Sequence, residues 1–134
     1  MTATGSFRRR QRLLDGTDFR RVFQQADPPR SSDAYLTLLA RPDNGLDWPR
    51  LGLAIGRKVT LRAVGRNRIK RLARESFRAE QHRLPPMDIV VLARPAAAAA
   101  DNATLWASLT RNWKRLRQRC GQSSSSPSGS TATS

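Results

Sequence analysis

The densest cluster of charged side chains lies between residues 57 and 74, and its members suit contact with phosphate. This stretch has no Asp or Glu and eight cations: Arg57, Lys58, Arg62, Arg66, Arg68, Lys70, Arg71 and Arg74. A guanidinium group presents a planar fork of donors that matches phosphate oxygens, and an ammonium group acts on them as a point charge. The chemistry that this stretch could do is therefore the binding of a polyanion.

The charge of the whole chain supports that interpretation. Its 134 residues include 25 Lys and Arg against 10 Asp and Glu, for a formal net charge of +15. Such an excess in a small chain points to nucleic acid as the partner. Arg accounts for 22 of the 25 cations. Because a GC-rich genome would give the same bias, we infer the partner from where the charges lie rather than from Arg content.

Most of the cluster falls on a long helix predicted for residues 63–84, which a proline pair ends. At about 100° per residue, apolar Ile69, Leu72 and Ala73 share one side of this helix. The other side carries Arg66, Asn67, Lys70, Arg71, Arg74 and Arg78. Basic pairs four residues apart repel by roughly a few tenths of a kcal/mol each, whereas a merely solvated face would mix signs. Phosphate contacts would offset that repulsion through counterion release, so we predict that this helix binds nucleic acid.

Groups that could make or break bonds are few and scattered. His82 is the only histidine and Cys120 the only cysteine, which excludes an internal disulfide and a zinc cluster. The aspartates stand singly at turn and cap positions, not as the paired set that two-metal phosphoryl chemistry needs. No glycine-rich phosphate loop of known spacing is present. We therefore expect neither a catalytic residue nor a metal site in this chain.

Two further helices are expected to accompany the long one. The first is capped by Thr17 and has apolar side chains at helical spacing, namely Phe19, Val22 and Phe23. The last begins at Asp101 or Asn102 and ends at Gly121. Its apolar stripe is predicted to consist of Leu105, Trp106, Leu109, Trp113 and Leu116.

Strands are predicted over residues 34–40, 51–56 and 88–93. The turn signal Asn44-Gly45 predicts that the first two pair as a hairpin. The third is a continuous apolar run, typical of a strand that is covered on both faces. In the second strand, large apolar residues alternate with Gly52, Ala54 and Gly56, which leaves one face nearly bare. A bare strand face lets a helix or a ligand come close.

The chain is expected to form one α+β domain over residues 13–120, a small two-layer sandwich. A basic arm at residues 1–12 precedes it, and residues 121–134 form a Ser-rich tail that we expect to be disordered. No segment approaches the roughly 18 apolar residues of a membrane span. The single cysteine suits a reducing compartment, so we expect a cytoplasmic protein.

The segment from Gly65 to Arg78 closely resembles the protein subunit of bacterial ribonuclease P. That family carries an Arg-Asn-Arg motif on a helix, continued as R-N-R-x-K-R-x-x-R-E-x-F-R. The flanking segments 18–23, 50–58 and 88–94 are also similar, so the resemblance covers roughly residues 10–119 and is greatest to the proteobacterial members. Gly56-Arg57-Lys58 departs from the small residue and two lysines that are common in the family, but it keeps the charge.

The resemblance implies a four-stranded α+β sandwich with a left-handed βαβ crossover, and a role in maturing the 5′ end of tRNA. The protein would bind the catalytic RNA subunit and the 5′ leader of precursor tRNA and assist endonucleolytic removal of that leader. The RNA subunit would carry the chemistry, with Mg2+ held by RNA rather than by the protein. Neither a membrane nor DNA is expected as a partner. The implied RNA-subunit-binding residues are Arg57, Lys58, Arg62, Arg66, Asn67, Arg68, Lys70, Arg71 and Arg74.

The resemblance also implies that the leader lies in a cleft between the first helix and the sheet, where Phe19, Phe23 and Tyr35 would contact it. Aromatic rings stack on bases without demanding a particular sequence. Both phenylalanines also have the spacing of core residues. The two interpretations stay open, and one ring could be buried while the other lines the cleft.

Charge and composition alone also fit two other classes of protein. A structural RNA-binding protein of the ribosomal kind has the same charge balance, and only the motif separates it from the reading above. It would not restore leader cleavage by the catalytic RNA at low Mg2+. A DNA-binding regulator would need helix-turn-helix spacing and usually a dimer surface, and neither is visible. It would prefer duplex DNA over structured RNA at matched salt.

Overall fold

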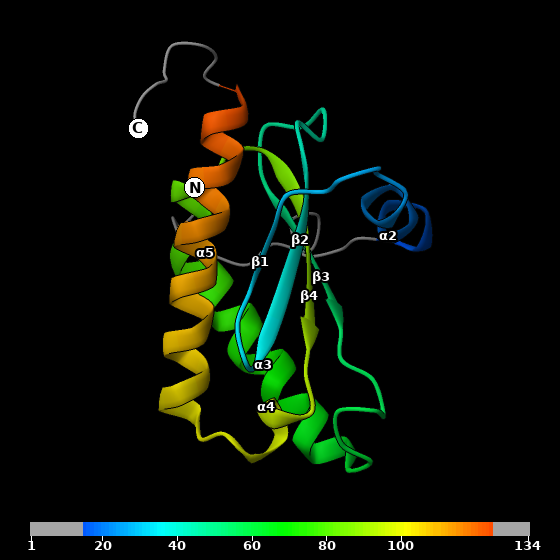
Figure 1. Cartoon of the computed structure of the whole chain (residues 1–134), viewed down its shortest axis with the longest axis vertical. Coiled ribbons are helices and arrows are strands. Elements are labelled where there is room, and N and C mark those ends of the chain that lie inside the picture. The colour runs from blue at the N-terminus through cyan, green and yellow to red at the C-terminus, as the bar shows by residue number, and fades with distance from the viewer. Residues whose placement is uncertain (1–14, 125–134) are drawn as a thin grey trace, which may run out of the picture.

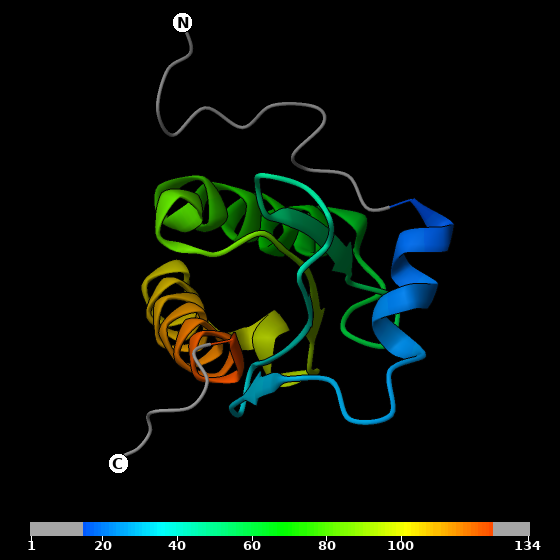
Figure 2. The same ribbon diagram turned by 90° about the horizontal axis from the view of Figure 1, so that it is seen from above.

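The computed structural model describes residues 15–124, and these form a mixed four-stranded sheet with helices on both faces (Figures 1 and 2). Figure 2 shows α2 on one side of the sheet and the pair α3 and α5 on the other. The elements in chain order are α2 Gly16–Phe23, β1 Arg30–Ser32, β2 Leu36–Pro42, β3 Arg50–Ala54, α3 Ala63–Glu80, the 3-10 turn η1 Gln81–Arg83, β4 Met87–Ala93, α4 Ala96–Ala99 and α5 Asn102–Ser124. The α+β class predicted from the sequence is confirmed.

The strand order across the sheet is β1-β2-β4-β3. β4 pairs antiparallel with β2, placing Leu38 opposite Val91, and parallel with β3, placing Leu51 opposite Ile89. The predicted hairpin between the strands at 34–40 and 51–56 is therefore wrong, because β4 lies between them. A turn signal fixes where the chain reverses but not which strand becomes the neighbour. The β4 strand is apolar except for Asp88 and gains the most burial at the centre of the sheet, with both faces covered as predicted.

The larger core lies between the sheet and the helices α3 and α5. Ile69, Leu72 and Phe77 of α3 face Leu109 and Trp113 of α5 within one buried cluster. The Trp113 indole N–H donates to the Ser76 hydroxyl at 2.7 Å, and its ring centroid lies 5.8 Å from that of Phe77. Glu80, near the end of α3, also accepts a hydrogen bond from Arg117 of α5 at 3.2 Å. These contacts fix α3 so that its opposite side faces outward.

The second face of the sheet carries a smaller cluster. Val22 of α2 packs against Leu39 of β2 and Val90 of β4. Phe19 and Ala54 are partly buried against the same cluster, so the bare face predicted for β3 is the face that α2 approaches. α2 covers this face in part, as a third layer beside the predicted two.

Several helix ends differ from those predicted. Asp15 rather than Thr17 caps α2, because its carboxylate accepts from the Asp18 amide at 2.9 Å while Asp18 accepts from the Asp15 amide at 3.1 Å. Asp101 caps α5 by accepting from the Thr104 amide at 2.8 Å. α5 continues past Gly121, where we predicted its end, to Ser124. Glycine within a helix costs only about 1 kcal/mol relative to alanine, so it does not end a helix by itself.

Two smaller features were also missed or misplaced. β1 is three residues long with the sequence Arg-Ser-Ser, so it carries no apolar alternation that could have predicted it. Trp106 was placed on the buried stripe of α5, but 39% of it is exposed. Trp106 follows Leu105 by about 100° around the helix, which places it at the edge of the stripe. The basic arm predicted for residues 1–12 and the tail beyond Ser124 lie outside the described residues.

Candidate nucleic-acid interface

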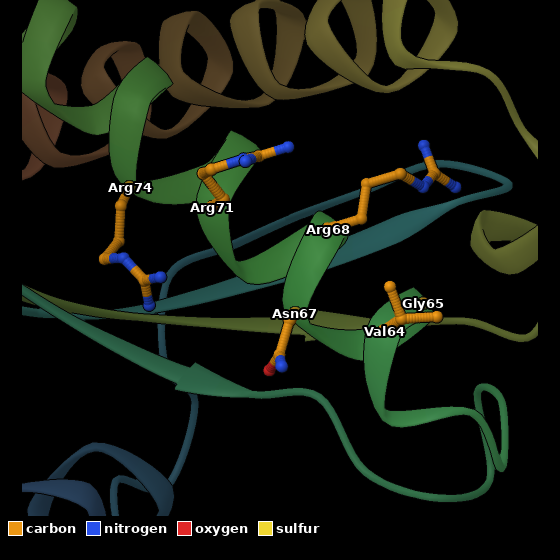
Figure 3. Close-up of a pocket in the computed structure, with 6 residues that line it drawn as sticks. All are labelled: Val64, Gly65, Asn67, Arg68, Arg71 and Arg74. Atoms are coloured by element: carbon orange, nitrogen blue, oxygen red, sulfur yellow. The ribbon is translucent and has the colours of Figure 1, made fainter.

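The outward side of α3 forms a groove of about 560 Å³ lined by Val64, Gly65, Asn67, Arg68, Arg71 and Arg74 (Figure 3). Four of these positions, Val64, Asn67, Arg71 and Arg74, recur on one side of the helix, opposite the buried side that carries Ile69 and Leu72. We call this side the α3 basic face. Asn67 and Arg71 are exposed on it and Arg74 is half-buried. Four of the nine predicted RNA-subunit-binding residues thus lie together in one groove.

No ion pair neutralises the α3 basic face within the described residues. In residues 15–124, none of the seven ion pairs involves any of the eight cations between Arg57 and Arg74. Glu75 is exposed on the same helix but forms no ion pair. The positive charge of this surface is therefore left largely uncompensated by ion pairs, which is the electrostatic footprint of a phosphate-binding surface.

Two of the predicted contacts are engaged within the protein itself. Arg66 donates from Nη1 to the carbonyl oxygens of Thr60 and Leu61, each at 3.0 Å. Arg68 donates from Nη1 to the Asn102 side chain at 2.7 Å and from Nη2 to the Ala100 carbonyl at 2.9 Å. In Figure 3, Arg68 extends to the side of α3 opposite to Asn67 and Arg74. These two arginines fix the loop before α3 and the start of α5, and their unused N–H groups remain available to phosphate.

The remaining predicted cations surround the start of α3. Arg57, Lys58 and Arg62 are exposed in the segment between β3 and α3, and Lys70 is half-buried at the edge of the α3 basic face. Gly65 lies close to this segment, because a Cβ added there would meet the Thr60 methyl group at 3.1 Å. The absence of a side chain at Gly65 thus lets the segment pack against the first turn of α3.

Two exposed aliphatic side chains among these cations were missed by the sequence reasoning. Leu61 is 81% exposed and Val64 is 72% exposed, and Val64 lines the groove. The exposure of Val64 could have been predicted from the sequence, because helical spacing puts this residue on the charged side of the helix. Exposed apolar groups among cations suit contact with the faces of unstacked bases.

The three predicted aromatic contacts do not come together. Phe19 is half-buried against the smaller cluster, whereas Phe23, on the next turn of α2, is 47% exposed. Tyr35 instead packs against the larger cluster, which α3 and α5 cover. We call Phe19, Phe23, Ala54 and Leu92 the α2 surface, since Ala54 and Leu92 are half-buried against the same small cluster. Tyr35 is separated from it because it packs against the larger cluster, which lies on the opposite face of the sheet from α2.

The remaining reactive groups are placed as structural residues. Cys120 is buried against the larger core, and this burial raises the pKa of its thiol to about 11. Within residues 15–124, no group of three or more His, Cys, Asp or Glu side chains could hold a metal ion. No helix in the same residues is both long and apolar enough to cross a bilayer.

Comparison with known proteins identifies the family. The sequence model of the ribonuclease P family matches residues 7–117. The ribonuclease P protein component of Methylococcus capsulatus is 51% identical over 119 residues, covering 89% of this chain and 91% of the relative. That of Photorhabdus laumondii is 53% identical over 110 residues, covering 82% and 90%.

The fold gives the same result. The structure of the Staphylococcus aureus RNase P protein superimposes with a TM-score of 0.71 at 27% identity, covering 78% of this chain and 93% of that one. The Thermotoga maritima RNase P protein superimposes with a TM-score of 0.64 at 31% identity, covering 81% and 96%.

Fold and surface together define an RNA-binding α+β protein with a basic helical face. The chain belongs to the ribonuclease P family, in which it is a protein component. It is thus the accessory subunit of an RNA–protein endoribonuclease, and binding of RNA and processing of tRNA 5′ ends follow from that membership. It works with the RNA subunit of the enzyme.

Proposed function

We propose that the α3 basic face binds the RNA subunit and that the α2 surface binds the 5′ leader of precursor tRNA. The α3 basic face carries the first assignment, because its cations form no ion pair in the described residues. Each phosphate that it neutralises releases condensed counterions, which favours binding to a long, folded RNA. Leu61 and Val64 add apolar contact to that electrostatic attraction.

The α2 surface supports the second assignment. A leader is single-stranded, so its bases are free to stack, and stacking on an aromatic ring is worth about 1–3 kcal/mol per base. Phe23 offers a ring that is 47% exposed, while Phe19 is partly covered by the small cluster beside it. Phe23 is therefore the primary stacking residue, and Phe19 shapes the floor next to it. Tyr35 is not part of this proposal.

We further propose that the Mg2+ ions needed for cleavage are held by the RNA subunit and the substrate. Three carboxylates of the described residues support this view, because Asp18 and Asp88 are bonded to Arg50, and Asp33 is bonded to Arg111. Mg2+ prefers an octahedral set of oxygen ligands that retains several waters. The isolated protein should therefore give no saturable heat of Mg2+ binding in calorimetry, and a stoichiometric site on it would contradict the assignment.

The cytoplasm is the proposed location, since precursor tRNA is made there. The burial of Cys120, the single cysteine of the sequence, is consistent with a reducing compartment. Cell fractionation that placed the protein with the membrane or the periplasm would contradict this.

The test of the proposed function uses the enzyme reconstituted from the RNA subunit and this protein. With the wild-type protein, cleavage of precursor tRNA at low Mg2+ should depend on the protein. Phe23→Ala should weaken binding of a precursor with a leader about fivefold or more, because one stacked base is lost, and should leave binding of mature tRNA unchanged. Equal loss for both RNAs would remove the leader assignment.

Variants of the two surfaces should fail differently. Arg71→Gln should weaken binding of the protein to the RNA subunit but should leave the preference for a leader unchanged once the enzyme is assembled. Phe23→Ala should leave binding to the RNA subunit unchanged but should reduce the preference of the assembled enzyme for a precursor with a leader. If both variants lowered only the affinity for the RNA subunit, the α2 surface would belong to the same interface as the α3 basic face, and the division of roles proposed above would be wrong.

A further inference from the structure

The guanidinium group of Arg50 joins three elements at one point. Its Nε and Nη2 donate to the two carboxylate oxygens of Asp88 in β4, both at 2.9 Å. Nη2 also donates to Oδ1 of Asp18 in α2 at 3.1 Å. The Asp88 side chain is fully buried, and those of Arg50 and Asp18 are 16% and 10% exposed. Arg50 at the start of β3 therefore links α2 to the centre of the sheet through charged hydrogen bonds away from bulk water.

The sheet side of this link is held in place independently of α2. Asp88 also accepts from the Asn44 amide at 2.9 Å and lies 3.6 Å from Nη2 of Arg41. A bidentate pair of hydrogen bonds between a guanidinium and a carboxylate group fixes the plane of both groups. The Nη2 atom of Arg50 is thereby aimed at one place above the sheet, and the Asp18 carboxylate occupies that place.

α2 has little else to set its position. It is eight residues long, which is too short for a helix to be stable alone, and Val22 is its only apolar side chain that is buried. One other polar contact follows the helix, where the Gln25 side chain donates to the Ala40 carbonyl of β2 at 2.8 Å. Asp18 anchors the first turn and Gln25 anchors the chain after the last turn, so the two contacts together fix the direction of α2.

We propose that Arg50 is a positioning residue for leader recognition, because it holds Asp18 and thereby sets where Phe19 and Phe23 stand over the sheet. Phe19 is adjacent to Asp18 in the chain, so a shift of the carboxylate moves the ring with it. This inference rests on the proposed leader-binding role of the α2 surface. Arg50 and Asp18 act through α2 and need not touch the RNA.

The test compares two substitutions in the same turn of α2. Asp18→Asn removes the charge that Arg50 holds and leaves the Arg50–Asp88 pair in the sheet intact. Asp15→Asn is the matched control, because it removes one negative charge from the same capping box at an exposed residue that makes no hydrogen bond to Arg50. Asp18→Glu keeps a carboxylate at the same position. For each enzyme reconstituted with the RNA subunit, we would measure affinity for precursor tRNA and for mature tRNA, and the melting temperature of the protein.

Asp18→Asn is expected to lower the preference for precursor over mature tRNA about three- to tenfold, a change of the size that one ordinary hydrogen bond contributes. Asp15→Asn should leave this preference unchanged, and Asp18→Glu should restore at least half of it. Binding of the RNA subunit should be equal in all three. If Asp18→Asn does not fold, Gln25→Met removes the other anchor of α2 and should lower the same preference.

Two results separate this inference from the function on which it rests. If Phe23→Ala loses the preference for a leader while Asp18→Asn and Gln25→Met keep it, the positioning role of Arg50 is wrong and leader binding stands. If Phe23→Ala also keeps the preference, leader binding by the α2 surface is wrong. A fall in melting temperature without any change in the preference would make the Arg50 link purely structural.

Discussion

Some arginines of α3 are held by hydrogen bonds within the protein and others are not, although their residue type is the same. Arg68 donates to Asn102 and to the Ala100 carbonyl, and so ties α3 to the start of α5. Arg71, one turn further on, is exposed in the groove, and no hydrogen bond holds its guanidinium within the described residues. The first therefore contributes to stability as well as charge, and the second contributes charge alone.

This division predicts different outcomes for matched substitutions. Arg71→Gln should reduce the slope of log affinity against log salt by about one and leave the melting temperature unchanged. Arg68→Gln should lower the free energy of unfolding by about 1 kcal/mol, because partly exposed hydrogen bonds are lost. Salt titrations of RNA-subunit binding and thermal melts check both. Equal melting temperatures for the two variants would mean that the Arg68 contacts contribute nothing.

Among the elements, α3 and α5 are joined by several contacts, of which Trp113 makes the central buried one. Trp113 is fully buried, packs against the Phe77 ring at a tilt of 57° and donates to Ser76, whereas Trp106 of the same helix is 39% exposed. Trp113→Ala should cost about 3–5 kcal/mol in the free energy of unfolding, and Trp106→Ala less than about 1 kcal/mol. Chemical denaturation of the two variants measures the difference. Similar losses would contradict the buried position of Trp113.

The turn between β1 and β2 is joined to α5 by Asp33. Burial alone would raise the pKa of this carboxyl. The hydrogen bonds that it accepts have the larger, opposite effect, so its pKa lies below the ordinary value of 3.8; the donors are Ser108, the Leu36 and Tyr35 amides and Arg111. A lowered pKa in the folded state means that the ionised form stabilises the fold. That stabilisation is complete well above 3.8 and is lost as the pH falls through the lower pKa of the folded state.

Asp33→Asn should therefore lower the melting temperature at neutral pH, where the wild-type carboxylate is ionised. The difference from wild type should stay constant down to about pH 5 and then shrink as the solution becomes more acidic. Melting curves across this range are the measurement. A difference that stays the same at every pH would show that charge on Asp33 is irrelevant to its role.

Local sequence patterns predicted the individual helices and strands better than they predicted which elements pair or pack together. The basic face of α3 and the buried β4 could be predicted because each is a property of one element, expressed at a fixed spacing. The pairing of β3 with β4 could not, because it depends on burial of both faces of the sheet. For the site, the groove residues Asn67, Arg71 and Arg74 followed from helical spacing. The Arg50–Asp18–Asp88 link could not be predicted, because Asp18 and Asp88 lie 32 and 38 positions from Arg50 and no local pattern connects them.

For the molecule as a whole, the net charge of +15 means that repulsion among cations outweighs attraction between opposite charges at long range. Self-repulsion among these cations destabilises the compact state when no RNA is present. Raising the ionic strength from about 0.01 M to about 0.15 M shortens the screening length from about 30 Å to about 8 Å. The melting temperature of the free protein should therefore rise over that interval in a simple chloride salt. A fall would mean that attractive ion pairs such as Arg50–Asp88 outweigh the repulsion.

The central position of β4 bears on how the chain is made. Both neighbours of β4 are synthesised before it, as is α3, so β3 has no strand to pair with until residue 93 has left the ribosome. Until then, β1 and β2 can pair, but the nascent α3 has no completed sheet to cover its apolar side. Arrival of β4 joins β2 and β3 in one step, and such long-range closure is slow compared with helix formation. The cationic helix is thus exposed during synthesis before its own core exists, and that core is complete only after β4 and then α5 have been made.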